Sequence, residues 1–307
     1  MNLKIKIILI LSLVVLSLSF LFLNYENISN RNSDGKIKIT TTLFPYYDFS
    51  GIIGGDKVKV SLLLPPGVEA HAFEPKPSDI FKINSSDIFI YTGDFMELWA
   101  KDILAGIGNK NIKVINLGDF VNLLREGAED SAADPHIWLD FSNSEKIVDA
   151  ILAALIQKDP QQGDFYNQNA DILKNKLRDL DKSFKDGLLD CQTKTLIYGG
   201  HYAFGYLVKN YNLNYLAAQG LAPDSEPTAQ DLAGLINELK NNNIKYVFYE
   251  ELSSPKIAET ISEETGAELL LLNAAHNITK QDLDNKVSFI DIMKENLENL
   301  RIGLQCQ

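Results

Sequence analysis

Four histidines stand out in this chain of 307 residues, because each lies where an apolar run gives way to a turn. The ends of strands commonly place functional side chains at such positions. Neutral imidazole is a favoured ligand for borderline-soft divalent cations, and three or four imidazoles suit zinc. The four are His71, His136, His201 and His276. Successive histidines are 65 to 75 residues apart, so any metal site that they share must be assembled by the fold.

His71 has the most informative surroundings, the segment LLLPPGVEAHAFEPKPSD. A buried strand ends there, two prolines and a glycine favour a turn, and a helix begins near Pro77. This order predicts that His71 lies at the carboxyl end of a parallel strand, where open α/β sheets bind ligands. The alternative is a loop histidine that is hydrogen-bonded to Glu74. His201 follows two glycines at the end of another predicted strand, and a structural histidine in the core is its alternative.

His136 lies in DPHIWLD, where apolar residues bury the segment and a proline stiffens its approach. A ligating histidine normally donates its other ring N–H to a carboxylate or carbonyl oxygen. Asp134, Asp140 and Glu74 are the candidate acceptors. His276 follows the apolar run ELLLL in the last predicted strand–helix loop, and its alternative role is to pack or cap that loop.

Short apolar runs alternate with amphipathic helical patterns along the chain, which predicts strand–helix units and parallel sheets. The predicted strands cover residues 37–44, 58–64, 88–91, 113–117, 195–198, 215–217, 246–249 and 268–272. The predicted helices cover residues 46–53, 77–84, 144–156, 203–210, 230–241, 255–265 and 281–304. A longer amphipathic stretch, about 161–189, contains no Gly or Pro between Asp164 and Asp186 and predicts one helix of roughly 25 residues.

The order of these elements predicts an α/β fold in which two α/β lobes with mostly parallel sheets are joined by one long rigid helix. We expect an N-terminal metal-binding lobe over residues 37–160, the linking helix over 161–190 and a C-terminal metal-binding lobe over 191–307.

The first 30 residues read as a signal peptide or N-terminal membrane anchor. Lys4 and Lys6 precede an apolar run of 17 residues, Ile7–Leu23, which is near the lower limit for crossing a bilayer. The body of the protein is therefore expected outside the cytoplasm, at the cell surface or in the periplasm. In that oxidising setting Cys191 and Cys306 can form a disulfide, and two unpaired thiols are the alternative. The net charge of −12 argues against nucleic acid as a partner.

Seven ordered motifs between about residue 37 and residue 300 resemble those of a known family, the zinc- and manganese-binding proteins of ABC importers (cluster A-I, or zinc-uptake A-type, solute-binding proteins). The motifs are TTLFPYYDF, LLPPGVEAHAFEPKPSD, DPHIWLD, GGHYAFGYL, SEPTAQDL, YVFYEELSSPKIAETISEETGAELLLL and FIDIMKENLENL.

The resemblance implies one metal ion between the lobes, with His71 and His136 from the first lobe and His201 from the second. Manganese-binding relatives tend to carry a carboxylate at the third position, so His201 favours zinc, in agreement with ligand softness. The family's usual fourth ligand is an aspartate at the position of Asn273 in this chain. His276 is our choice for the fourth ligand, and Asn273, Glu251 or a water molecule is the alternative.

The function implied is an extracytoplasmic substrate-binding protein that captures Zn²⁺ and delivers it to an ABC importer permease with its cytoplasmic ATPase. We expect a monomer without enzymatic activity, held at the membrane by its N-terminal segment, whose zinc binding weakens below about pH 6.5 as the imidazoles protonate. The alternatives are a manganese-binding member of the family, a zinc hydrolase with Glu251 as general base, and a surface adhesin.

Overall fold

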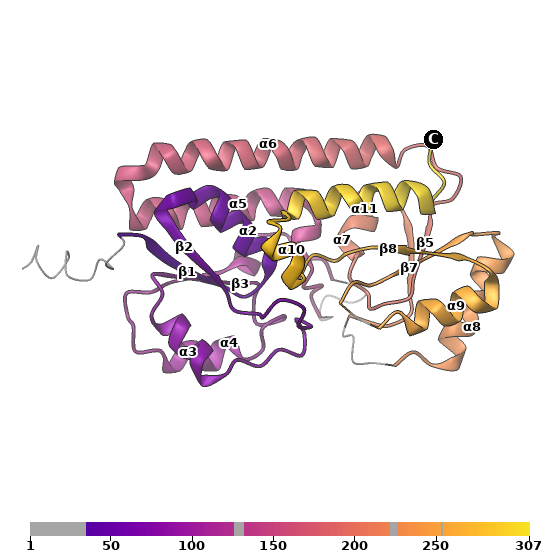
Figure 1. Ribbon diagram of the computed structural model, residues 1–307, viewed down its shortest axis with the longest axis horizontal. Helices are drawn as coiled ribbons and strands as arrows, with labels where there is room; N and C mark the ends of the chain where they lie inside the picture. The colour runs from indigo at the N-terminus through magenta and orange to yellow at the C-terminus, as the bar shows by residue number, and fades with distance from the viewer. Residues whose placement is uncertain (1–34, 126–131, 222–225, 253) are drawn as a thin grey trace, which may run out of the picture.

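Two four-stranded parallel sheets organise the chain (Figure 1). The computed structural model describes residues 35–125, 132–221, 226–252 and 254–307. The strand order is β2-β1-β3-β4 in the first sheet and β6-β5-β7-β8 in the second, and every pairing is parallel. Each sheet with its helices forms one lobe, so the predicted fold class is confirmed.

The first lobe contains the strands β1 (Ile37–Thr41), β2 (Val58–Leu62), β3 (Ile88–Tyr91) and β4 (Lys113–Asn116). Its helices are α2 (Phe44–Gly54), α3 (Pro77–Asn84), α4 (Ala100–Gly106) and α5 (Phe141–Lys158), with 3₁₀ turns η1 (Gly55–Lys57), η2 (Leu117–Asp119), η3 (Ile137–Leu139) and η4 (Pro160–Gln162). The second lobe contains β5 (Thr195–Tyr198), β6 (Asn214–Ala217), β7 (Tyr246–Tyr249) and β8 (Glu268–Leu271). Its helices are α7 (Gly205–Asn210), α8 (Ala229–Asn241), α9 (Lys256–Thr265), α10 (Lys280–Asp284) and α11 (Phe289–Gly303).

The long helix α6 (Gly163–Gly187) is 25 residues, as predicted, and runs along one side of both lobes (Figure 1). At 1.5 Å per residue it is about 37 Å long. Its buried residues recur every three or four positions and face α2, α5 and α11; they are Tyr166, Ala170, Leu173, Leu177, Leu180 and Phe184. A single continuous helix packed along its length against three others makes a stiff connection between the lobes.

The C-terminal region differs from the single helix predicted over residues 281–304. It forms two helices, because the chain turns after α10 through Lys286, whose φ is 59°, and restarts at Ser288. Ser288 and Asp291 form a capping box that begins α11. Helix α11 packs against α2 and α6 as well as against β7 and β8, and the Phe49 and Phe289 rings meet edge to face with centroids 5.2 Å apart. The last helix therefore contacts both lobes.

Cys191 and Cys306 form a disulfide, the first of the two alternatives considered for them. It ties the segment after α6 to the end of the chain. No helix within the described ranges is long and apolar enough to cross a membrane, and the apolar run Ile7–Leu23 lies outside them.

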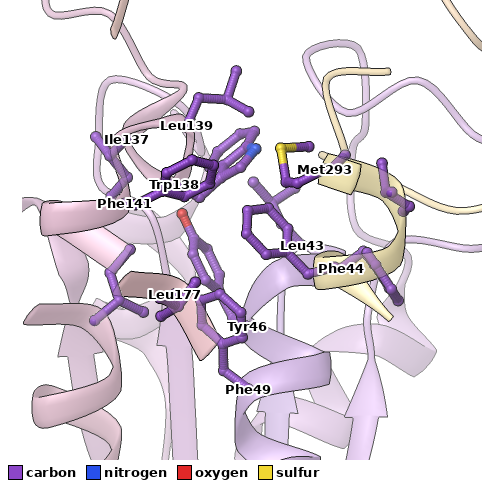
Figure 2. Packing of buried hydrophobic residues seen from close by; sticks show 14 of the residues in the cluster. Leu43, Phe44, Tyr46, Phe49, Ile137, Trp138, Leu139, Phe141, Leu177 and Met293 are labelled. Carbon is purple, nitrogen blue, oxygen red and sulfur yellow. The ribbon is translucent and has the colours of Figure 1, made fainter. Parts of the chain in front are cut away.

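A buried apolar cluster contains residues of both lobes, and Figure 2 shows part of it. Trp138 packs there with Tyr46 of α2, and Met293 of α11 lies in the same cluster (Figure 2). The Trp138 indole N–H donates a hydrogen bond of 2.7 Å to the carbonyl of Ala274, in the loop that follows β8. The segment that carries His136 and the segment that carries His276 are thus fixed to one common core.

Candidate metal centre

The side chains of His71, His136 and His201 converge between the two sheets. One potential ligand atom of each lies within 4.8 Å of the other two. Nε2 of His136 and Nε2 of His201 are 3.1 Å apart, and the His71 ring centroid lies 5.4 Å and 5.2 Å from theirs. Nitrogens bound tetrahedrally at 2.0–2.1 Å from a zinc ion are about 3.4 Å apart. The spacing therefore suits a single ion held by imidazoles from both lobes.

The predicted positions of these histidines follow from the parallel sheets. His71 lies in the loop between β2 and α3, and His201 follows β5, so both lie beyond the carboxyl ends of strands. His136 precedes the turn η3. A Cβ atom at Gly200 would lie 2.7 Å from Oε2 of Glu250, and one at Gly199 would lie 2.6 Å from Ala258. The two glycines thus let the His201 segment pass close to α9 and to Glu250.

Asp134 orients the His136 ring. One oxygen of its buried carboxylate lies 2.8 Å from Nδ1 of His136 and 2.9 Å from the His136 backbone nitrogen. Donation from Nδ1–H to this carboxylate leaves Nε2 as the free donor atom for a metal. Of the three predicted acceptors, Asp134 is confirmed. Asp140 instead caps α5, and Glu74 is exposed, so neither acts in that role.

The carboxylate beside His201 is Glu250, a residue that the sequence reasoning missed. Its Oε1 lies 2.8 Å from Nδ1 of His201, although out of line for a hydrogen bond, and its Oε2 accepts a 3.4 Å hydrogen bond from the His201 backbone nitrogen. Glu250 comes directly after β7, and β7 pairs with β5, whose end carries His201. Its position directly after a predicted strand could have identified Glu250 as a candidate site residue.

His276 lies next to these rings but is not part of the close trio. It is 1% exposed, and its ring centroid lies 6.1 Å from that of His201 and 6.4 Å from that of His71. Its Nδ1 is buried without a hydrogen-bond partner. Among the other candidates, Asn273 uses its Oδ1 to accept from Ala275 N at 2.7 Å, and Glu251 accepts from a backbone N–H at 3.1 Å.

Burial favours the uncharged form of His71, His136 and His276. It lowers the pKa of His71 to about 2, with the neighbouring His136 and His201 adding to the shift, and it lowers the pKa values of His136 and His276 well below 6.5. Neutral rings have lone pairs available for a cation. The sequence predicts that zinc binding weakens below about pH 6.5, whereas the burial of these three rings moves their competition with protons to lower pH.

Nδ1 of His276 and Nε2 of His71 are both buried and without a hydrogen-bond partner. Such buried polar atoms are uncommon and carry a free-energy cost unless something binds them. Because Nε2 of His71 has no partner, this nitrogen does not form the hydrogen bond to Glu74 that was the alternative considered for His71.

A cavity of about 580 Å³, lined by Phe73, Met96 and Trp99 among others, reaches His71. His71 is only partly buried, unlike the other three histidines.

Two α/β lobes on a stiff helix, with clustered imidazoles between them, define a metal-binding protein of the two-lobed solute-binding class. The profile of the family described as "Zinc-uptake complex component A periplasmic" matches residues 39–303. The chain belongs to this family.

The chain is 36% identical over 282 residues to the high-affinity zinc uptake system protein ZnuA of Bacillus subtilis, and the match covers 88% of each chain. It is 33% identical to the zinc-binding lipoprotein AdcA of Streptococcus pneumoniae, matching 89% of this chain but 57% of that longer protein. The Zn(II)-bound ZnuA-like domain of that AdcA superposes with a TM-score of 0.77 at 34% identity, covering 88% of this chain and 99% of the domain.

Proposed function

We propose that this protein captures Zn²⁺ outside the cytoplasm and delivers it to an ABC importer permease that works with a cytoplasmic ATPase. The observation that carries the proposal is the convergence of His71, His136 and His201. They come from both lobes, and one potential ligand atom of each lies within 4.8 Å of the other two. The family match and the zinc-binding relatives support it. Zinc is the cargo in this reading.

The donor set favours zinc over manganese. Imidazole nitrogens suit zinc, whereas manganese prefers oxygen donors. The carboxylates Asp134 and Glu250 face the Nδ1 atoms of their histidines, so they orient the rings and leave the opposite ring nitrogens for the ion. Family and relatives are transport components, which does not favour the hydrolase reading with Glu251 as base.

We further propose His276 as the fourth ligand. Its buried ring lies beside those of His71 and His201, and it has a nitrogen without a partner. Asn273 and Glu251 each use one side-chain oxygen to accept a hydrogen bond from the backbone of the His276 loop, although Oε1 of Glu251 is buried without a partner. An imidazole is the donor that matches the other three. A small shift of the His276 loop would complete a tetrahedral site of four imidazoles.

The remaining parts of the proposal concern organisation. We propose a monomer with a first lobe over residues 37–160, the linking helix over 161–190 and a second lobe over 191–307. Residues 1–30 serve as signal peptide or membrane anchor, which holds the protein at the cell surface or in the periplasm.

Metal titration tests the function. The purified protein is stripped with a chelator and titrated with zinc and with manganese by calorimetry, and the unstripped protein is analysed for metal content. One tightly bound zinc per chain, with much weaker manganese binding, is the expected result. Absence of tight binding for both ions would overturn the proposal.

A further inference from the structure

Two loops from different lobes, each carrying a proposed ligand, are hydrogen-bonded directly to each other. The first is the His71 loop, residues 63–76 between β2 and α3, and the second is the His276 loop, residues 272–279 between β8 and α10. The side-chain amide of Asn277 donates to the carbonyl of Pro65 at 2.8 Å and to that of Val68 at 2.6 Å. In addition, Gly67 N donates to the carbonyl of Ile278 at 2.9 Å.

Asn277 is built into this contact. Its side chain is fully buried, and its Oδ1 accepts a 2.8 Å hydrogen bond from Ile278 N, so every polar atom of the side chain has a partner. Only an amide can donate two hydrogens while accepting through its oxygen at this position. The residues that it holds, from Pro65 to Val68, are exposed. The exposed turn from Pro65 to Val68 is therefore held to the other lobe by this one side chain together with the backbone bond from Gly67 to Ile278.

The contact lies next to both ligands. His276 immediately precedes Asn277, and His71 follows Val68 by three residues. His71 is also the histidine that the cavity of about 580 Å³ reaches, whereas His136, His201 and His276 are 0–1% exposed. A movement of the His71 loop would open the site on the side that already has access to solvent.

We propose that Asn277 is a positioning residue for zinc binding: it fixes the His71 loop to the His276 loop, and breaking its two bonds to Pro65 and Val68 releases His71 from the ion. The inference rests on the proposed zinc-binding function. It assigns the step that limits zinc release to the separation of these two loops.

The test compares zinc dissociation from the full chain carrying Asn277→Ala or Asn277→Asp with dissociation from the unaltered protein. Asp keeps the size of the side chain but cannot donate to the two carbonyls, so it serves even where the Ala variant folds poorly. Zinc is chased with excess chelator in a stopped-flow instrument, and bound Co²⁺ reports the coordination geometry by its visible absorption. We expect dissociation at least about tenfold faster, with a weaker tetrahedral Co²⁺ spectrum, because a misplaced ligand loosens the site.

A double-mutant cycle with His71→Ala separates positioning from general stability. If Asn277 acts through His71, its substitution has little further effect on dissociation once His71 is absent. Asn296→Ala is the matched control, because Asn296 is 1% exposed and its hydrogen bonds go to the backbone of Asn273 in the same His276 loop and to Met293. Its effect is expected to be the same with and without His71.

An unchanged dissociation rate in both Asn277 variants would overturn the inference, as would an equal effect in the presence and absence of His71. These results leave the proposed function standing, provided that the unaltered protein binds zinc. Failure of the unaltered protein to bind zinc overturns both.

Discussion

Replacement of His276 by alanine tests the proposed four-histidine site most directly. His276 is 1% exposed, lies 6.1 Å from the His201 ring centroid, and has an unpartnered ring nitrogen. Substituting a residue that merely orients a metal ligand typically costs about 10–100-fold in affinity. Loss of a ligand is therefore expected to weaken zinc binding by more than about 100-fold, which is about 2.8 kcal/mol at roughly 1.4 kcal/mol per decade. The backbone carbonyl of this residue, which accepts from Phe44 N at 3.1 Å, is retained in the variant.

Asn273→Ala is the matched comparison, because the family resemblance implies a ligand at the position of Asn273 in the same loop. Its Oδ1 makes one local hydrogen bond, to Ala275 N, and such a bond contributes about 0.5–1.5 kcal/mol. We expect a loss of affinity of no more than about tenfold. Both variants are measured by competition with a chelator of known affinity at pH 7, after thermal melts show that the metal-free forms are folded. A larger loss in Asn273→Ala than in His276→Ala would refute the choice of His276.

Three further substitutions test other parts of the reasoning. His201→Asp places an oxygen donor in the site and is expected to raise manganese affinity relative to zinc; an unchanged ratio of the two dissociation constants would argue that His201 is not a ligand. Glu250→Gln keeps the shape of the side chain but removes the charge beside Nδ1 of His201, and zinc affinity measured by competition is expected to fall about 10–100-fold; unaltered affinity would show that this carboxylate does not support the ring. Burial raises the pKa of the Asp48 carboxyl group to about 6. Between about pH 4 and 6 the folded protein therefore keeps Asp48 protonated while the unfolded chain does not, and at pH 7 the ionised carboxylate destabilises the fold. Asp48→Asn can still accept from Phe289 N and is expected to raise the free energy of unfolding in urea by at most about 3 kcal/mol at pH 7 and by little near pH 4; the same effect at both pH values would contradict this account.

The fold was readable from the sequence because its signals are local. Helix α6 follows from an amphipathic pattern without Gly or Pro, and β7 (Tyr246–Tyr249) is a short apolar run with the predicted bounds. The sequence also contains a signal for the break between α10 and α11, because Ser288 and Asp291 form a capping box inside the helix that we predicted as continuous. Helix α4 (Ala100–Gly106) was missed.

Less of the metal centre than of the fold could be predicted from the sequence. His71 and His201 could be predicted as site residues because each follows a strand at the carboxyl edge of its own parallel sheet, where ligands bind. That the two edges face each other came only from the family resemblance. Which carboxylate supports which ring depends on the order of strands in the sheet. Glu250 meets His201 because β7 neighbours β5, and this adjacency is a property of the assembled sheet that no sequence period records.

The role of Asn277 could not be predicted from local sequence patterns. Its partners lie 209 and 212 residues earlier in the chain, in a loop that has no periodic pattern. From the sequence it is one more polar residue after a strand, whereas in the fold it is a fully buried amide whose hydrogen bonds join the two lobes beside His71 and His276. Because α6 and α11 restrict large movements of the lobes, the loops are the parts of the site that can move with least disruption of the core. Control of zinc release by this contact between loops therefore fits the architecture better than a wide opening of the two lobes.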